Sequence, residues 1–158
     1  MSLLKWFKTA PEMPTSLLYD ESTFYQAFMT DLGKCEKEVV IESPFITCSR
    51  MEVVRPLIER LLMKGVKVHI ITRDPIEHSE DFGYEATNEI LNCVEMGIHV
   101  VLLRGNHHRK LAILDRKVLW EGSLNILSQS YSQEVMRRIE GEKAAKDMFR
   151  FVNMDKFI

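Results

Sequence analysis

Three apolar segments, separated by two segments of helical pattern, constrain the fold of this chain more than any other feature. The apolar segments are rich in β-branched residues and cover residues 38–45, 66–73 and 98–103. Continuous apolar runs of this kind are typical of strands that are covered on both faces. Apolar residues at helical spacing predict a helix in each interval, over residues 49–64 and 84–96. Because strands that alternate with helices pair in parallel, this region predicts a parallel β-α-β-α-β unit.

The helices carry further signals at their ends. The spacing of apolar residues predicts an earlier helix over residues 22–32. After the first apolar strand, Ser49 and Glu52 have the spacing of a capping box, which predicts the start of the next helix there. Pro56 is unfavourable in a helix interior, so this helix either kinks at Pro56 or begins close to it.

In the C-terminal half, the strands are too close together for helical crossovers. Residues 109–115 and 117–122 are predicted to form an antiparallel hairpin that turns at residues 116–117. One more strand over residues 133–139 and a closing helix over residues 142–151 complete the chain. The predicted class is therefore α/β, with a mixed, largely parallel sheet and helices on both faces.

Length and hydropathy limit the domain organisation. The chain has 158 residues, of which 46% are hydrophobic, so we expect one domain over residues 19–158 and an N-terminal arm or linker over residues 1–18. Four apolar residues of this arm are expected to pack on the domain or on a partner, namely Leu3, Leu4, Trp6 and Phe7. No apolar run approaches the roughly 18–20 residues that span a bilayer, so we expect no stable membrane insertion and a cytoplasmic protein.

Charge and cysteine content argue against several classes of function. The formal net charge of -2 argues against binding nucleic acid through bulk positive charge. Cys35, Cys48 and Cys93 are odd in number and far apart, which indicates free thiols and neither a disulfide framework nor a zinc site. We therefore expect no metal and no cofactor.

The segment NHHRKLAILDRKVLWEGSLN, residues 106–125, places polar residues where a strand is usually apolar. His108 and Lys110 are two residues apart, so on a strand they point to the same face. Burying both groups without partners would be costly, so their surroundings must be wet or must hold an anion. A neutral imidazole can act as a nucleophile or base, and ammonium and amide groups, such as that of Asn125, can hold phosphate oxygens.

These residues resemble the H-x-K-x4-D-x6-G-S-x-N signature of the phospholipase D superfamily, with every spacing matched. The matched residues are His108, Lys110, Asp115, Gly122, Ser123 and Asn125. The predicted order of strands and helices is also similar to one half-domain of that family, over most of residues 20–152. Glu134 occupies the place of a family acid that usually stands in an Asn-x-Glu sequence, although the Asn position here is Ser132.

The resemblance implies a role for most of the motif. His108 would attack phosphorus and form a phosphohistidine without a metal ion, while Lys110 and Asn125 would bind the non-bridging oxygens. Ser123 and Glu134 would orient and polarise a histidine, because a carboxylate that bonds one ring nitrogen raises the basicity of the other.

The remaining acid of the motif, Asp115, stands at the end of the predicted hairpin. It is expected to tie down the turn and to be structural more than catalytic.

The implied mechanism needs two histidines. One attacks, and a second protonates the leaving oxygen, a contribution of roughly 100- to 10,000-fold. Members of the superfamily meet this need with two copies of the motif, whereas this chain has one. We therefore expect a homodimer in which two motifs form one composite site across a two-fold axis.

The charge around the motif favours nucleic acid as the substrate. Residues predicted to contact the substrate are basic, apart from a glycine that permits close backbone approach: Arg104, Arg109, Arg116, Lys117 and Gly122. Together with a resemblance to the small dimeric nucleases of the superfamily, this predicts an endonuclease for DNA or RNA. A partner, or a fused helicase or restriction subunit, would supply any sequence preference.

Two alternatives stay open. A phospholipid-headgroup phosphodiesterase would need an apolar rim at the site, for which the sequence offers only Leu124, Ile126 and Leu127. A non-catalytic nucleic-acid-binding module of a larger restriction or helicase-type system would keep the motif but would turn over no substrate.

Overall fold

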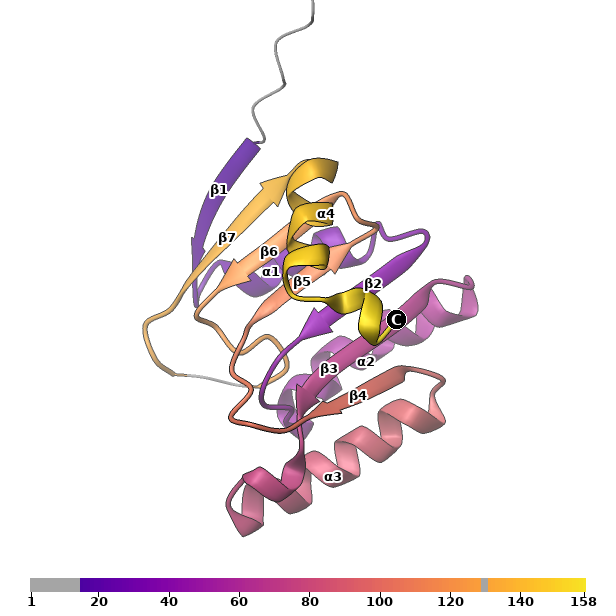
Figure 1. The fold of residues 1–158 in the computed structure, drawn as a ribbon, viewed down its shortest axis with the longest axis vertical. Coiled ribbons are helices and arrows are strands. Elements are labelled where there is room, and N and C mark those ends of the chain that lie inside the picture. The colour runs from indigo at the N-terminus through magenta and orange to yellow at the C-terminus, as the bar shows by residue number, and fades with distance from the viewer. Residues whose placement is uncertain (1–14, 129–130) are drawn as a thin grey trace, which may run out of the picture.

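The computed structural model describes residues 15–128 and 131–158, which form a seven-stranded sheet with helices on both faces (Figure 1). The strand order is β1-β7-β6-β5-β2-β3-β4. The strands are β1 (Thr15–Asp20), β2 (Glu38–Glu42), β3 (Lys67–Arg73), β4 (His99–Leu103), β5 (Leu111–Leu114), β6 (Val118–Gly122) and β7 (Val135–Glu140). The predicted α/β class with a mixed sheet is confirmed, but the sheet is not largely parallel as predicted, because four of its six strand pairings are antiparallel. Its parallel part is β2, β3 and β4, and all other neighbours pair antiparallel.

The helices cover the two faces of the sheet unequally. One face carries α1 (Phe24–Leu32), α2 (Cys48–Met63) and α3 (Glu80–Glu95), and the other carries α4 (Glu142–Phe151), with short 3-10 helices at Pro75–Glu77 and Met154–Lys156. In β2, Val39 and Ile41 pack into the larger core beneath the first three helices, whereas Val40 packs beneath α4. Burial on both faces explains why this strand is apolar without interruption.

Strand β1 is an element that the sequence did not predict. Residues 15–18, expected in the arm, belong to β1, which pairs antiparallel with β7. The strand escaped prediction because it is an edge strand whose residues are almost all exposed, with only Tyr19 packing on the larger core. Residues 1–14, including the apolar residues of the predicted arm, lie outside the described part of the chain.

The predicted capping box of α2 is wrong. The helix begins at Cys48 after Thr47, which makes no side-chain capping hydrogen bond, and so it starts before Ser49 and Glu52. The first turn is instead held from another helix, because the backbone N–H of Cys48 donates to Glu85 Oε1 of α3 at 2.8 Å. A carboxylate at this position satisfies an orphan donor and favours the positive end of the helix dipole.

Two other helix boundaries differ from simple expectation. Pro56 lies in the interior of α2, which continues to Met63, so the proline does not mark the start of the helix. Helix α3 begins at Glu80, four residues earlier than predicted, and the acidic side chains of Glu80 and Asp81 occupy its first turn.

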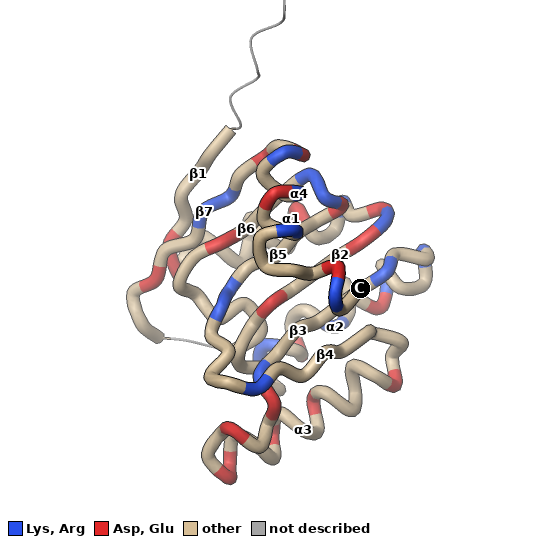
Figure 2. Tube along the Cα trace, viewed as in Figure 1, with Lys and Arg blue, Asp and Glu red and all other residues tan. Residues whose placement is uncertain are grey.

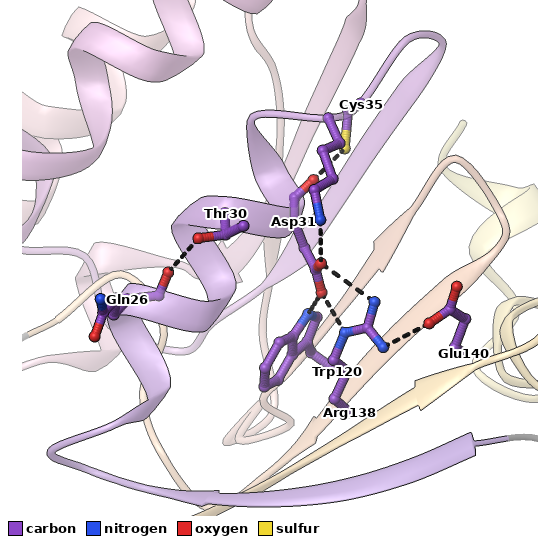
Figure 3. Close-up of polar contacts among 8 residues, drawn as sticks. Gln26, Thr30, Asp31, Cys35, Trp120, Arg138 and Glu140 are labelled. Carbon is purple, nitrogen blue, oxygen red and sulfur yellow. Dashed lines mark hydrogen bonds and ion pairs between the residues drawn. The ribbon is translucent and has the colours of Figure 1, made fainter.

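A buried polar network joins α1 to the antiparallel half of the sheet (Figure 3). Asp31 of α1 accepts a hydrogen bond from the indole nitrogen of the fully buried Trp120 at 3.1 Å. The same carboxylate pairs with Arg138 of β7, whose guanidinium also reaches Glu140 at 2.9 Å. Because every polar group of this network has a partner, the network can fix the position of α1 without an unpaired buried charge.

Candidate active site

All seven strands of the sheet have one end at the same edge, and the polar residues of the motif lie there. The carboxyl ends of β1, β2, β3, β4 and β6 meet the amino ends of β5 and β7 at this edge. His108 and Lys110 lie just before β5, Ser123 and Asn125 follow β6, and Glu134 precedes β7. Segments that are distant in the sequence therefore contribute to one site, at the edge where ligands of α/β sheets usually bind.

His108 and Lys110 lie side by side, although not on a strand as predicted. β5 begins only at Leu111, so both residues belong to the loop before it. The Lys110 ammonium lies 2.6 Å from Nδ1 of His108 and donates to the His108 backbone oxygen at 2.7 Å. The side chain of Lys110 is therefore held in place by His108.

The surroundings of this pair favour a neutral histidine. Burial lowers the pKa of His108, and the positive charges of Lys110 and Arg73 lower it further. This shift favours the neutral imidazole over the charged form. Burial also lowers the pKa of Lys110, against the opposing effect of the Glu134 carboxylate. The neutral form of His108 is the form that can attack phosphorus.

Ser123 and Glu134 form a second polar pair of the site. The Ser123 hydroxyl donates to one carboxylate oxygen of Glu134, and the Ser132 hydroxyl donates to the other. Ser123 also accepts a hydrogen bond from the backbone N–H of Val135 at 3.1 Å, which ties the end of β6 to the start of β7. Ser132, which stands where the family usually has asparagine, therefore contacts the same carboxylate as Ser123.

Gly122 and Asn125 complete this end of the site. A Cβ atom on Gly122 would lie 2.1 Å from the backbone oxygen of Val135, so only glycine fits between β6 and β7 here. The side-chain oxygen of Asn125 is buried and has no hydrogen-bond partner among the described residues. An amide with unused hydrogen-bonding capacity beside a histidine and a lysine is suited to a polar ligand.

A cavity of about 880 Å³ joins these residues. Its polar end is lined by His108, Lys110, Ser123, Asn125 and Glu134, together with Arg109, Arg137 and Gly122. Apolar residues also line it, namely Leu18, Leu111, Val135, Met148, Phe151 and Val152. Of the elements that contribute them, β1 and the end of α4 were not placed near the motif by the sequence.

Glu42 is a site residue that sequence reasoning missed. It is fully buried at the end of β2, where Oε1 lies 3.1 Å from Nε2 of His107 and 2.8 Å from the guanidinium of Arg109. Burial raises the pKa of Glu42, and Arg109 opposes that rise. The carboxylate contacts the residues on either side of His108, so it positions the loop that carries the histidine.

Arg73 is a second residue that the sequence did not single out. It ends β3, its Nε donates to the backbone oxygen of His107 at 3.1 Å, and its guanidinium lies 5.4 Å from the ring centre of Phe45. No carboxylate lies within ion-pair distance of Arg73 in the described chain. The sequence signal that could have identified Arg73 is its position at the carboxyl end of an apolar strand.

The predicted basic patch is divided by the structure. Arg109 lines the cavity, whereas Arg104 pairs with Asp74 at 2.7 Å outside it. Arg116 pairs with Glu38 at 2.6 Å, and its guanidinium lies 3.5 Å above the ring of Phe149. Lys117 lies in the turn between β5 and β6, at the sheet edge opposite the site. Figure 2 shows the basic residues spread over several parts of the surface.

Asp115 lies at the same remote edge of the sheet. Its carboxylate accepts hydrogen bonds from the backbone N–H groups of Glu36, Lys37 and Glu38, at 2.8–2.9 Å. The carboxylate therefore holds the residues that enter β2 against the turn after β5. This position does not allow it to contact a phosphate beside His108, and it gives the motif aspartate a structural role.

Comparison with known proteins identifies the family. A family profile described as "Cardiolipin synthase, PLD-like domain" matches residues 28–155, which is most of the chain. The chain belongs to the phospholipase D superfamily. This superfamily is one of phosphodiesterases, and that reaction class is what membership supports. No curated protein sequence matches the chain.

Solved structures of the superfamily share the fold. Nuc from Salmonella typhimurium, described as a phospholipase D family member, has a TM-score of 0.68 and 17% identity over 88% of this chain and 91% of that chain. NucT from Helicobacter pylori has a TM-score of 0.70 and 17% identity over 90% and 95% of the two chains. Phosphatidylserine synthase from Haemophilus influenzae Rd KW20 has a TM-score of 0.71 and 17% identity over 89% of this chain and 38% of that chain. At this identity the likeness shows the fold alone.

Residues 15–128 and 131–158 contain neither a cluster of metal-binding side chains nor a helix that could span a membrane. No group of three or more histidine, cysteine, aspartate or glutamate side chains there is arranged to hold a metal ion. No helix of this part of the chain is long and apolar enough to cross a membrane.

Proposed function

We propose that this protein is a metal-independent phosphodiesterase in which His108 is the nucleophile. The observation that carries the proposal is the contact between His108 and Lys110, at 2.6 Å, in the same cavity as Ser123, Asn125 and Glu134. A cationic and amide-lined end of a cavity would hold the phosphate oxygens and stabilise the charge that develops on them in the transition state.

The reaction would proceed in two displacements. A ring nitrogen of His108 attacks phosphorus and forms a P–N bond while the bond from phosphorus to the leaving oxygen breaks. That oxygen takes a proton from a second histidine. Water then gives a proton back to this histidine, attacks phosphorus and breaks the P–N bond, which releases the phosphate product and restores His108. Lys110 and Asn125 bind the non-bridging oxygens in both steps, and the paired Ser123 and Glu134 orient a histidine.

We propose that the second histidine is His108 of another copy of the chain. The other histidines of this chain have contacts of their own: His107 with Glu42, His78 with Phe45, and His69 with His99. A two-fold axis beside the cavity would bring two copies of the motif together, so the proposed enzyme is a homodimer with one composite site.

Nucleic acid is the substrate that we propose first. Lys110, Arg109 and Arg137 line the cavity and Arg73 lies beside its histidine, so a polyanionic strand would meet several positive charges there. Fewer basic residues support this substrate than the sequence predicted, because Arg104, Arg116 and Lys117 do not line the cavity.

The apolar lining of the cavity favours a second candidate, a phospholipid-headgroup phosphodiesterase. Such an enzyme needs an apolar surface for acyl chains next to the phosphate, and Leu18, Val135 and Phe151 provide one with exposed side chains. Leu124, Ile126 and Leu127, from which the sequence offered a rim, are buried in the core and cannot form it.

One experiment separates the candidates. The protein is incubated with plasmid DNA, short single-stranded DNA and RNA, and phospholipid vesicles, all in excess EDTA. Cleavage of nucleic acid is the result that we expect. Cleavage of vesicle lipid alone would show that the substrate is a phospholipid and would leave the proposed mechanism in place. Binding of nucleic acid without any turnover would favour a non-catalytic module.

Arg73 is expected to bind the phosphate together with Lys110. Replacing Arg73 with Gln removes a positive charge that acts on His108 and is expected to weaken binding of inorganic tungstate or phosphate by about 10- to 100-fold. Isothermal titration calorimetry measures this affinity without requiring turnover. Arg104→Gln is the matched control, because Arg104 is outside the cavity and pairs with Asp74. Equal affinity in the two variants would contradict the role.

A further inference from the structure

Helix α3 and strand β4 expose an apolar surface whose cavity shares no lining residue with that of the candidate active site. The two are neighbours, because His78 of its lining packs on Phe45, whose ring centre lies 6.3 Å from that of His108. Large side chains in this region are unusually exposed, namely Ile76 at 75%, Tyr84 at 74%, Leu91 at 55% and Leu102 at 45%. They line a cavity of about 660 Å³ between α3, the 3-10 helix before it and the end of β4. An apolar patch with a hollow at its centre is typical of a surface that binds a protein segment.

The same surface carries negative charge at the start of α3. This helix contains five acidic residues and no lysine or arginine. Glu80 and Asp81 are exposed in its first turn, whereas Glu85 bonds to the start of α2 and the buried Glu89 pairs with Arg55. Figure 2 shows acidic residues alone along α3. Glu80 lines the cavity and, with Asp81, has no ion pair in the described part of the chain. A matching ligand is therefore a segment that combines large apolar side chains with positive charge.

One segment of this chain has that chemistry. Residues 3–8, LLKWFK, contain four large apolar residues and two lysines, Lys5 and Lys8, and no acid. These residues precede the described part of the chain, which begins at Thr15 in β1. Within the described part of the chain, the edge strand β4 pairs with another strand on one side alone, so a segment that docks in extended form could also bond to its backbone.

The reach of the chain decides which copy the segment can bind. Strands β1 and β4 are the two outer strands of the seven-stranded sheet, so about 29 Å separates them at roughly 4.8 Å per strand. Thr15 also lies at the end of the sheet opposite the cavity, because β1 and β4 run in the same direction. Phe7 precedes Thr15 by eight residues and reaches at most about 29 Å when fully extended. A path around the surface is longer than that.

We infer that residues 3–8 of one copy dock in the cavity between α3 and β4 of a second copy. Leu3, Leu4, Trp6 and Phe7 would cover the exposed side chains of the cavity, and the two lysines would meet Glu80 and Asp81. The N-terminal segment of each chain would thereby hold two copies together. The cavity that binds it shares no lining residue with the proposed composite site.

Tryptophan fluorescence tests this inference, because the chain has only two tryptophans. Trp120 is fully buried and hydrogen-bonded to Asp31, so its emission is constant and Trp6 reports on docking. Leu91→Arg places a bulky positive charge in the cavity and is expected to shift the emission to the red. Val53→Arg is the matched control, because Val53 is also 55% exposed but lies on α2 outside the cavity. It is expected to leave the emission unchanged.

Mixing shows whether docking occurs between copies. The Leu91→Arg chain keeps Trp6 but has a blocked cavity. A Trp6→Phe chain lacks this fluorophore but has an intact cavity. Adding an excess of the Trp6→Phe chain is expected to return the Trp6 emission to the blue. Two results would overturn the inference: a red-shifted emission in the unaltered protein, or no return of the Leu91→Arg emission on mixing. Neither readout depends on catalysis, so the outcome is independent of the proposed activity.

Discussion

Replacement of His108 by asparagine is expected to lower kcat/KM for phosphodiester cleavage by about 10⁴-fold or more, the scale on which loss of a nucleophile acts. In the proposed mechanism the imidazole supplies the nitrogen that bonds to phosphorus, and an amide cannot replace it. Lys110 and Asn125 remain in place, so affinity for the substrate is expected to change little. Steady-state kinetics and a binding titration on the same variant separate the two quantities.

The control for this prediction is His99→Asn. His99 is an exposed residue of the edge strand β4, and its Nδ1 lies 3.1 Å from that of His69, away from the cavity. Its replacement is expected to leave kcat/KM within a factor of about 2 of the unaltered protein, because neither residue contacts the site. Comparable losses in the two variants would point to a general effect on folding and would remove the support for His108 as the nucleophile.

Asp115→Ala is expected to lower the free energy of unfolding by about 3 kcal/mol, because three backbone N–H groups lose a charged acceptor. Asp115→Asn keeps an acceptor oxygen for Lys37 and Glu38, so its effect is expected to be about half as large. Chemical denaturation measures both variants. Asp155→Ala, at an exposed site in the last 3-10 helix, is the control and is expected to change stability by less than about 0.5 kcal/mol.

The pH dependence of this effect follows from the direction of the pKa shift. Burial raises the pKa of Asp115, but the backbone hydrogen bonds from Glu38, Glu36 and Lys37 outweigh burial and leave the pKa below its ordinary value. A lowered pKa in the folded state gives stability that is present above about pH 4 and is lost as the pH falls further. The difference between the unaltered protein and Asp115→Ala should therefore shrink in acid. A difference that stayed constant down to pH 2 would contradict this account.

The sequence predicted the local elements well because their signals are local. The apolar runs of β2, β3 and β4 and the hairpin of β5 and β6 follow from periodicity over a few residues. Strand β1 was missed because an exposed edge strand has little apolar pattern to detect. The capping box of α2 was wrong because the carboxylate that holds the helix start, Glu85, comes from another helix.

The residues of the candidate site that belong to the motif could be predicted from the sequence. The residues that the fold of the sheet brings to the site from other strands could not. Glu42 and Arg73 reach the site from the ends of two other strands, so their roles depend on strand order. The basic patch was misjudged for a related reason. A hairpin sends its turn to the sheet edge opposite its ends, so Arg116 and Lys117 lie a strand length away from Arg109.

The most direct measurement of the central claim is the activity of mixed dimers. His108→Asn chains and unaltered chains are mixed in varying ratios, allowed to exchange, and assayed in excess EDTA. If one composite site needs His108 from both copies, activity per unaltered chain falls to about half in an equal mixture, because mixed dimers are inactive. Undiminished activity per unaltered chain at every ratio would contradict the composite site and would show that one chain carries out the reaction alone.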